Sequence, residues 1–173
     1  HTKRVSELAV AVAREISTEQ NDHELIERAA ELHDVGKSAT PDSILYKPGK
    51  LEPDEWEQMK QHSVIGEQII STSPSLAPIA RLVRHSHEHW NGDGYPDRLE
   101  GTEIPLGSRI ILVCDALEVM LSGSPYSQAV DLDQALHELE RCAGHQFDPN
   151  VVDVLLRLVR EGQVDPMPDH EQV

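Results

Sequence analysis

Apolar residues recur three and four positions apart along most of this chain, the spacing of one face of an α-helix. A run that keeps this period over eight or more residues favours a helix over a buried strand. The sequence therefore predicts an all-α fold, a single compact domain of about seven helices. The expected helices cover Val5–Ile16, Glu24–Leu32, Glu55–Ile70, Leu76–Val83, Ser108–Leu121, Leu132–Cys142 and Val151–Val159.

Polar and glycine residues at the ends of these segments set the expected helix boundaries. Side chains that can accept a hydrogen bond from a first-turn N–H stand at several starts, and Pro149 suits a first helical position. The expected N-caps are Asp22, Ser73 or Ser75, Asp131 and Asp148, and the expected stops are Gly36, Gly123 and Gly144. The stretch Arg109–Val113 resembles a strand in composition, but its apolar spacing continues to Leu121, so its length favours a helix.

Two long connections, residues 38–53 and 90–107, are rich in proline and glycine. Loops of this length inside a compact domain are uncommon and usually functional. We expect the domain to span residues 1–162, with residues 163–173 as a frayed tail.

Charge excludes one large class of partner. The chain carries 31 acidic and 15 basic side chains, a formal net charge of −16. Such a chain repels polyphosphate, so DNA and RNA are not expected as partners. No apolar run approaches the roughly 18 residues of a membrane span, and no signal-peptide pattern is present, so we expect a soluble, intracellular domain without a membrane span.

Histidines and acids supply the candidate chemistry. His33 and Asp34 follow an apolar helix, whose C-terminal end favours cations, and the two carboxylate oxygens of Asp34 can bridge two metal ions. The alternative is a capping histidine beside a solvated aspartate. His62 lies in an amphipathic segment, where a histidine is also commonly a satisfied core or surface residue.

Asp115 interrupts an apolar helix, where burying an unpaired carboxylate costs several kcal/mol. It needs a cation, a partner such as Arg109 or Arg84, or a place at the helix surface. Two divalent cations held by neutral imidazoles and two carboxylates would keep a charge of about +2, which attracts a phosphodiester. Ligands of this kind without thiolate suit Fe, Mn, Ni or Co. A bridging water would be acidified for attack on phosphorus, with Lys37 stabilising the charge on the phosphate oxygens.

Two motifs resemble those of HD-GYP domains, a bacterial branch of the HD metal-dependent phosphohydrolases. Residues 33–37 (HDVGK) resemble the HD-[IV]-G-K signature, and residues 87–96 (HEHWNGDGYP) resemble the H-H-E-x-x-D-G-x-G-Y-P signature. Further short segments resemble those of the family in the same order, and the resemblance extends from His1 to about residue 160. The resemblance implies an all-helical phosphodiesterase that uses a metal-bridging hydroxide to hydrolyse cyclic di-GMP to pGpG or GMP.

The resemblance also assigns roles to individual residues. Asp34 would bridge two divalent metals, with Fe or Mn expected and Ni, Co or Zn as alternatives. Lys37 would contact the phosphate, and Tyr95 would lie against the nucleotide. The resemblance further implies a bacterial cytoplasmic protein with an upstream sensory or receiver domain, and diguanylate cyclase (GGDEF) domains as partners. The implied metal ligands are His1, His33, Asp34, His62, His87 and Asp115.

Three serines depart from the family pattern. Ser86 replaces one of two consecutive histidines, which makes His85 a candidate substitute ligand, and Ser124 and Ser127 replace basic residues that grip the dinucleotide. Each lost charged hydrogen bond weakens binding by roughly 10-fold to 100-fold. Two other functions therefore stay open: a noncatalytic module that binds a nucleotide or partner domain, and a hydrolase of another cyclic dinucleotide or a phosphomonoester. Trp56 and Trp90 are expected to be packing residues.

Overall fold

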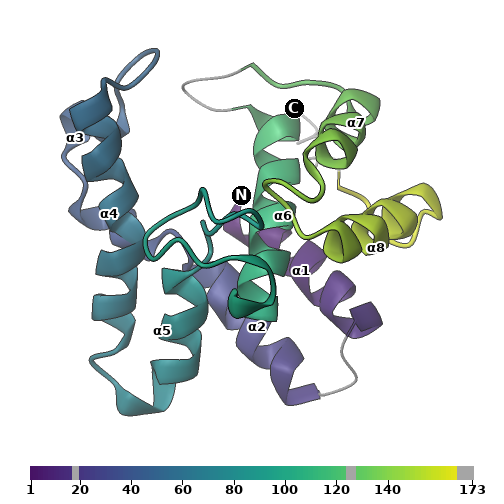
Figure 1. The fold of residues 1–173 in the computed structure, drawn as a ribbon, viewed down its shortest axis with the longest axis horizontal. Coiled ribbons are helices and arrows are strands. Elements are labelled where there is room, and N and C mark those ends of the chain that lie inside the picture. Colours follow the sequence, from purple (N-terminus) through teal and green to yellow (C-terminus); the bar gives the residue numbers. More distant parts are fainter. Residues whose placement is uncertain (17–19, 124–127, 167–173) are drawn as a thin grey trace, which may run out of the picture.

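Helices form most of the residues that the computed structural model describes, which are 1–16, 20–123 and 128–166 (Figure 1). Isolated β-bridges are present, but the described residues contain no β-strand. The all-α prediction is therefore confirmed. The α-helices are α1 (Thr2–Ile16), α2 (Gln20–Leu32), α3 (Asp42–Leu45), α4 (Pro53–Ile70), α5 (Ala77–Arg84), α6 (Leu106–Ser122), α7 (Leu132–Cys142) and α8 (Pro149–Arg160), and the 3-10 helices are η1 (Val35–Ala39), η2 (Pro74–Leu76) and η3 (Gly101–Glu103).

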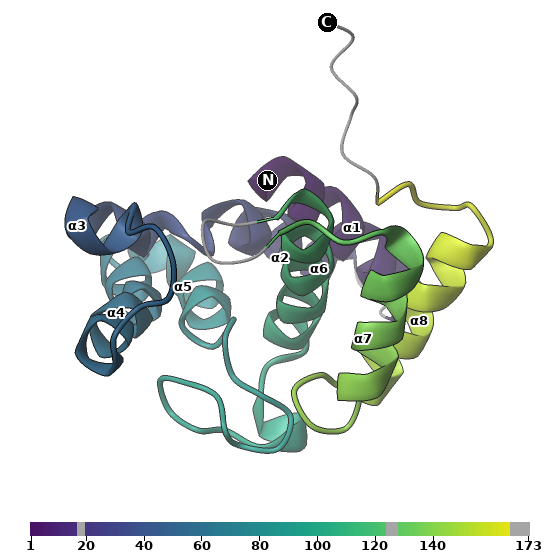
Figure 2. The same ribbon diagram turned by 90° about the horizontal axis from the view of Figure 1, so that it is seen from above.

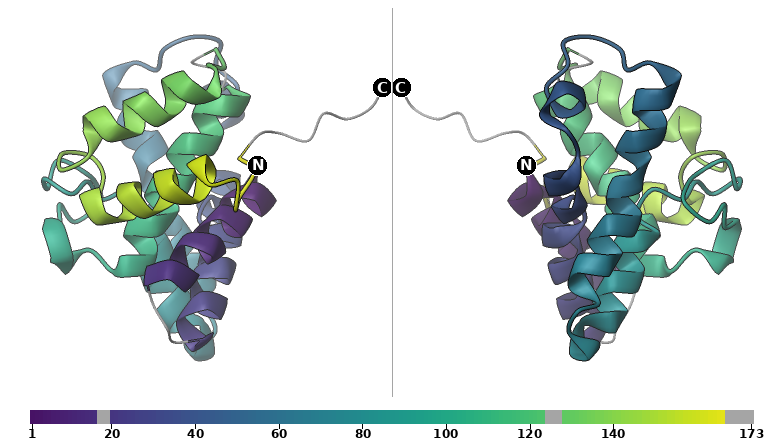
Figure 3. Two further views of the ribbon diagram at one scale, coloured as in Figure 1. Left: turned by 90° about the vertical axis from the view of Figure 1, so that its right-hand side faces the viewer. Right: turned by 90° about the vertical axis from the view of Figure 1, so that its left-hand side faces the viewer.

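Helix α6 stands at the centre and packs against α1, α2, α7 and α8. Figure 2 shows α3, α4 and α5 on one side of α6 and α7 and α8 on the other. In Figure 3, α8 lies beside α1 on one face, and α4 and α5 lie together on the opposite face. The helices therefore surround α6 and bring residues from distant parts of the sequence close to it.

The sequence of α6 explains its central place. Ile110, Ile111, Val113 and Leu117 are fully buried, which removes several large apolar side chains from water on more than one face of the helix. The strand-like stretch Arg109–Val113 is thus helical, as its length predicts.

Two of the expected N-caps are confirmed. Asp131 accepts a hydrogen bond from the Gln134 N–H, and Asp148 accepts one from the Asn150 N–H with proline at the first helical position. Both side chains satisfy first-turn donors that no helical carbonyl can reach.

The other expected N-caps are wrong. Helix α2 begins at Gln20, so Asp22 lies in its first turn, where a carboxylate still faces the positive end of the helix. Ser73 precedes η2 without a side-chain cap, because its hydroxyl instead lies 3.0 Å from that of Ser75.

The two predicted long loops differ in structure. The first contains the one-turn helix α3, which is too short to produce a recognisable period. The second is irregular apart from η3 and reaches from α5 to α6. Ser124, Ser127 and most of the expected tail, residues 167–173, lie outside the described residues. Within the described part of the chain, none of the helices combines the length and apolar character of a membrane span.

Candidate metal centre

Two buried histidines present the same nitrogen to one site. His33 follows α2 and donates from Nδ1 to the Ala30 carbonyl at 2.7 Å. His62 on α4 donates from Nδ1 to the Met59 carbonyl, also at 2.7 Å. A carbonyl can only accept, so Nδ1 of each ring carries a proton, and the lone pair of the neutral ring lies on Nε2. That is the form of imidazole that a metal ion binds.

Gly36 allows α4 to approach the HD pair closely. A Cβ at this position would lie 1.9 Å from the His62 carbonyl oxygen and 2.6 Å from the Gly66 nitrogen. The expectation that Gly36 ends a helix is wrong, since it lies within η1 and has no positive φ. The glycine is needed for close packing, which brings His62 beside Asp34.

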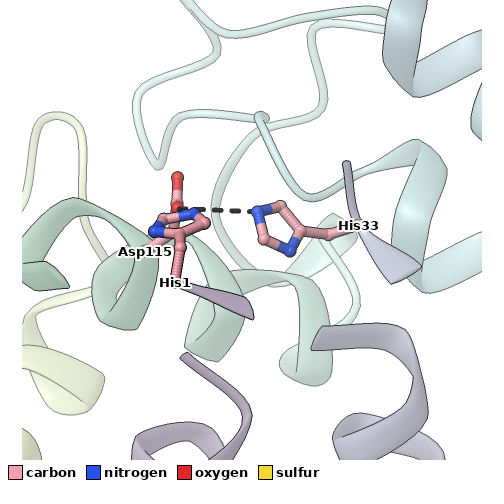
Figure 4. Close-up of side chains that lie close together, drawn as sticks. All are labelled: His1, His33 and Asp115. Atoms are coloured by element: carbon pink, nitrogen blue, oxygen red, sulfur yellow. Dashed lines mark ion pairs between the residues drawn. The ribbon is translucent and has the colours of Figure 1, made fainter. Parts of the chain in front are cut away.

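His1, His33 and Asp115 form one potential set of ligands, here called the His1 group (Figure 4). Asp115 Oδ1 lies 3.1 Å from His1 Nε2 and 3.5 Å from His33 Nε2. Three elements contribute: the start of α1, the end of α2 and the middle of α6. The structure thus gathers residues that are 32 and 82 positions apart in sequence.

Asp34, His62 and His87 form a second set, the His62 group. Asp34 Oδ1 lies 3.6 Å from His62 Nε2, and the Nε2 atoms of His62 and His87 are 2.9 Å apart. Asp34 Oδ1 also lies 3.7 Å from His33 Nε2 in the His1 group. This oxygen therefore lies between the two groups.

Two atoms at the junction of the groups lack hydrogen-bond partners. Among the described residues, His33 Nε2 and Asp34 Oδ1 are the buried side-chain atoms left unsatisfied. Burying such groups without a partner costs roughly 1–3 kcal/mol each. A cation would satisfy both atoms, and imidazole with carboxylate is a ligand set that divalent transition metals accept. The residues present fit a metal centre.

In the His1 group, the histidines and Asp115 shift one another's pKa. The hydrogen bond from His1 to Asp115 raises the pKa of His1 to about 9. Burial alone would raise the pKa of Asp115, but His1 and His33 together hold it well below its usual range. Asp115 is therefore ionised, as a ligand must be.

The His62 group has different electrostatics. Desolvation lowers the pKa of His87 to about 3 and also lowers the pKa of His62, so both rings are neutral at pH 7. Burial would raise the pKa of Asp34, but His33 and Lys37 lower it. Lys37 Nζ donates to Asp34 Oδ2 at 2.6 Å, which leaves Oδ1 directed at the histidines.

The alternative partners for Asp115 are engaged elsewhere. Arg109 pairs with Asp148 at 2.6 Å, and Arg84 pairs with Asp97 at 2.6 Å. Neither arginine neutralises Asp115.

His85 and Ser86 lie outside both groups. His85 Nδ1 contacts the Arg81 carbonyl at 2.9 Å, and its Nε2 lies 3.0 Å from an Asp97 oxygen. Ser86 is buried and donates to the Val83 carbonyl. The structure does not bring the candidate substitute His85 to the site.

The loop that contains Gly94, Tyr95 and Pro96, here called the GYP loop, places an aromatic ring beside the His62 group. Tyr95 stacks on His87 with ring centroids 5.2 Å apart and an interplanar angle of 13°. The buried carboxylate of Glu88 accepts hydrogen bonds from the backbone N–H groups of Asp97, at 2.6 Å, and Leu99, at 3.1 Å. These contacts fix the loop immediately after Tyr95.

Two cavities meet at Tyr95. One, of about 440 Å³, reaches His87 and Asp115 and is largely apolar. The other, of about 430 Å³, is lined by polar groups that include Lys60. Trp56, expected to be a packing residue, borders both cavities: its ring meets that of Tyr95 edge-on at 6.4 Å between centroids, and its side chain is exposed. An exposed tryptophan at the entrance to a polar site is available to a ligand.

The sequence did not single out Glu118, which lies three residues after Asp115 on the same face of α6. It is buried, and its carboxylate accepts hydrogen bonds from His1 Nδ1 and the Ser122 hydroxyl. Its position inside an apolar helix is the same signal that singled out Asp115.

Comparison with known proteins identifies relatives across nearly the whole chain. The chain is 44% identical over 158 residues to the cyclic di-GMP phosphodiesterase response regulator RpfG of Xanthomonas campestris pv. campestris (strain 8004), covering 90% of this chain and 42% of that protein. It is 36% identical over 158 residues to 3'3'-cGAMP-specific phosphodiesterase 2 of Vibrio cholerae serotype O1, covering 90% of this chain and 30% of that protein. The chain thus spans less than half the length of these relatives.

Solved structures share the fold. A crystal structure of a cyclic GMP-AMP-specific phosphodiesterase from V. cholerae superposes with a TM-score of 0.75 at 20% identity, covering 94% of this chain and 44% of that chain. A model of the family described as HD domain matches residues 1–151. The chain belongs to the HD domain family, which confirms the resemblance read from its HD and GYP motifs.

Proposed function

We propose that this chain is a metal-dependent phosphodiesterase that hydrolyses cyclic di-GMP to pGpG or GMP. The observation that carries the proposal is the convergence of all six expected ligands into two adjacent groups linked by Asp34 Oδ1. The name of the 44% identical relative supports the same substrate.

The proposed cofactors are two divalent ions, Fe or Mn, with one in the His1 group and one in the His62 group. Asp34 is proposed to bridge them, because its Oδ1 lies within 3.7 Å of a histidine nitrogen in each group. When bound, the ions supply Lewis-acid activation of water and neutralise the phosphate oxygens.

The chain itself supplies orientation and charge. Lys37 fixes Asp34 through Oδ2, and its partly exposed ammonium group is close enough to the site to contact a phosphate oxygen. Tyr95 is held against His87 by the GYP loop and is proposed to contact the nucleotide. Burial raises the pKa of Tyr95, so its hydroxyl keeps its proton and can donate a hydrogen bond. These groups position a phosphodiester without forming a covalent bond to it.

A turnover assay tests the proposal. Protein loaded with Fe²⁺ or Mn²⁺ is incubated with cyclic di-GMP, and the products are separated by chromatography. We expect pGpG or GMP from the wild type and a loss of at least about 100-fold in Asp34→Ala, which removes the shared ligand. Asp133→Ala, at an exposed position of α7, is the matched control and is expected to keep full activity. Absence of turnover under every metal condition would contradict the proposal.

A second candidate substrate is 3'3'-cGAMP, because a 36% identical relative is named for it. A panel of cyclic di-GMP, 3'3'-cGAMP, cyclic di-AMP and a phosphomonoester separates these possibilities by kcat/KM. Binding without hydrolysis of any of them would instead support the noncatalytic module.

We propose that residues 1–162 act as the catalytic domain of a bacterial cytoplasmic protein, regulated by an upstream sensory or receiver domain. Diguanylate cyclase (GGDEF) domains are the proposed partners.

A further inference from the structure

Three histidines of the two groups, His1, His33 and His62, have an Nδ1 partner, and they are not held alike. His33 and His62 each donate Nδ1 to a neutral carbonyl three residues earlier in the chain. His1, at the start of α1, is held from another element, because its Nδ1 contacts the Glu118 carboxylate on α6. An anionic acceptor makes an imidazole a stronger ligand than a neutral one does.

The two groups also differ in charge, and this difference again favours a cation in the His1 group. In the His1 group, the His1 ring contacts two carboxylates, Asp115 through Nε2 and Glu118 through Nδ1. In the His62 group, the carboxylate of Asp34 is already paired with Lys37 at 2.6 Å. Once a metal ion has displaced the proton that His1 Nε2 shares with Asp115, it meets two carboxylates in the His1 group, whereas the carboxylate of the His62 group stays paired with Lys37.

We infer that the two metal positions are unequal, and that Glu118 is the positioning residue that makes the His1 group the tighter one. Glu118 is buried and accepts a second hydrogen bond from the Ser122 hydroxyl at 3.2 Å, so its carboxylate is held in place before a metal binds. The His62 group fills second. This inference rests on the proposed metal centre and adds the order in which its positions fill.

Titration with Mn²⁺ tests the inference without any measurement of activity. Metal-free protein is titrated while free Mn²⁺ is followed by electron paramagnetic resonance. We expect two steps in the wild type, separated by about tenfold or more. Glu118→Gln keeps the shape of the side chain but removes its charge, and should weaken the tighter step by about 10-fold to 100-fold while leaving the other within about twofold. Ser122→Ala keeps the charge of Glu118 but removes one hydrogen bond that holds it, so it should weaken the tighter step by less than Glu118→Gln does and leave the other within about twofold.

A double-mutant cycle separates positioning from a general loss of structure. In His1→Ala, the tighter step should disappear, and adding Glu118→Gln should then change nothing further. Lys37→Met, at a half-exposed position, frees the shared Asp34 and should tighten both steps without changing their order. Circular dichroism of each metal-free variant checks the fold. If Glu118→Gln does not fold, the His1→Ala titration still decides the order of filling.

The outcomes separate this inference from the proposed function. Two equal steps, an equal loss in both steps of Glu118→Gln, or an effect of Glu118→Gln that persists in His1→Ala would overturn the inference and leave the proposed phosphodiesterase intact. A wild type that binds no Mn²⁺ would overturn both.

Discussion

At the scale of single residues, the site depends on how backbone groups hold its side chains. The carbonyls of Ala30 and Met59 fix the ring orientation of His33 and His62 before any ligand arrives. These rings lose their rotamer freedom during folding, when apolar burial compensates for the lost entropy. Metal binding therefore does not have to restrict them. The donor atoms are therefore preorganised.

Gly36 gives a prediction at this scale. Gly36→Ala would place a methyl group 1.9 Å from the His62 carbonyl oxygen, so α4 has to move away. We expect a loss of about 1–3 kcal/mol in the free energy of unfolding, together with weaker metal binding, because His62 moves with the helix. Chemical denaturation and metal titration measure the two effects.

Gly66→Ala is the matched control, since Gly66 lies at the same interface. A Cβ there meets Val83 Cγ1 at 3.1 Å, a side-chain contact that a small shift relieves. Alanine also favours a helix over glycine by about 1 kcal/mol, so this variant should be nearly neutral. Equal stability losses in the two variants would refute the special role of Gly36.

At the scale of elements, the GYP loop is anchored by side chains at the end of α5. Arg84 donates to both carboxylate oxygens of Asp97, at 2.6 and 2.8 Å, and His85 Nε2 lies 3.0 Å from one of them. Together with the backbone contacts of Glu88, these bonds attach the loop to the helix that carries it. Tyr95 is thereby held at the site from two directions.

The charge on Asp97 makes this anchor dependent on pH. The hydrogen bond from Arg84 lowers the pKa of Asp97 in the folded protein. A carboxyl group whose folded pKa lies below its unfolded value of about 3.9 contributes stability above that value, and the contribution is lost as pH falls through the folded pKa. Asp97→Asn should therefore reduce the free energy of unfolding by roughly 1 kcal/mol or less at pH 7, because the pair is partly exposed.

The same variant should match the wild type in stability at a pH below the folded pKa of Asp97. Urea unfolding of both proteins across the acid range measures this difference. A gap that stays constant with pH would show that the lost contact is not electrostatic.

The helices could be predicted from sequence because their apolar faces repeat over many residues. The stretch from Leu106 to Ser122 produces a clear period, whereas α3 has only four residues and produces none. Local capping was less predictable. Asp131 caps α7, but Asp22 does not cap α2, because an acidic side chain is also stabilised within the first turn of a helix.

The candidate site was predictable only in part. His33, His62 and Asp115 were identified by motif and by the cost of burying charge, and the structure brings them to one place. Glu118 was missed although its position inside an apolar helix carries the same signal as that of Asp115, and Trp56 was expected to pack although its side chain is exposed. Their contacts depend on the angle between α1, α4 and α6, which no local pattern encodes.

At the scale of the whole molecule, the fold resolves an electrostatic conflict. A chain with a formal net charge of −16 repels an anionic substrate over long distances. The structure gathers histidines and two ionised aspartates, Asp34 and Asp115, around a point where cations would reverse that charge locally. Substrate binding should therefore require the metal, and added salt should weaken the long-range repulsion.

The most direct test of this account is the metal content of the protein purified without chelator. Elemental analysis should find about two divalent ions per wild-type chain, and distinctly fewer in Asp34→Ala and Asp115→Ala, each measured beside the control Asp133→Ala. A wild type without bound metal, or variants that retain the full wild-type content, would contradict the account.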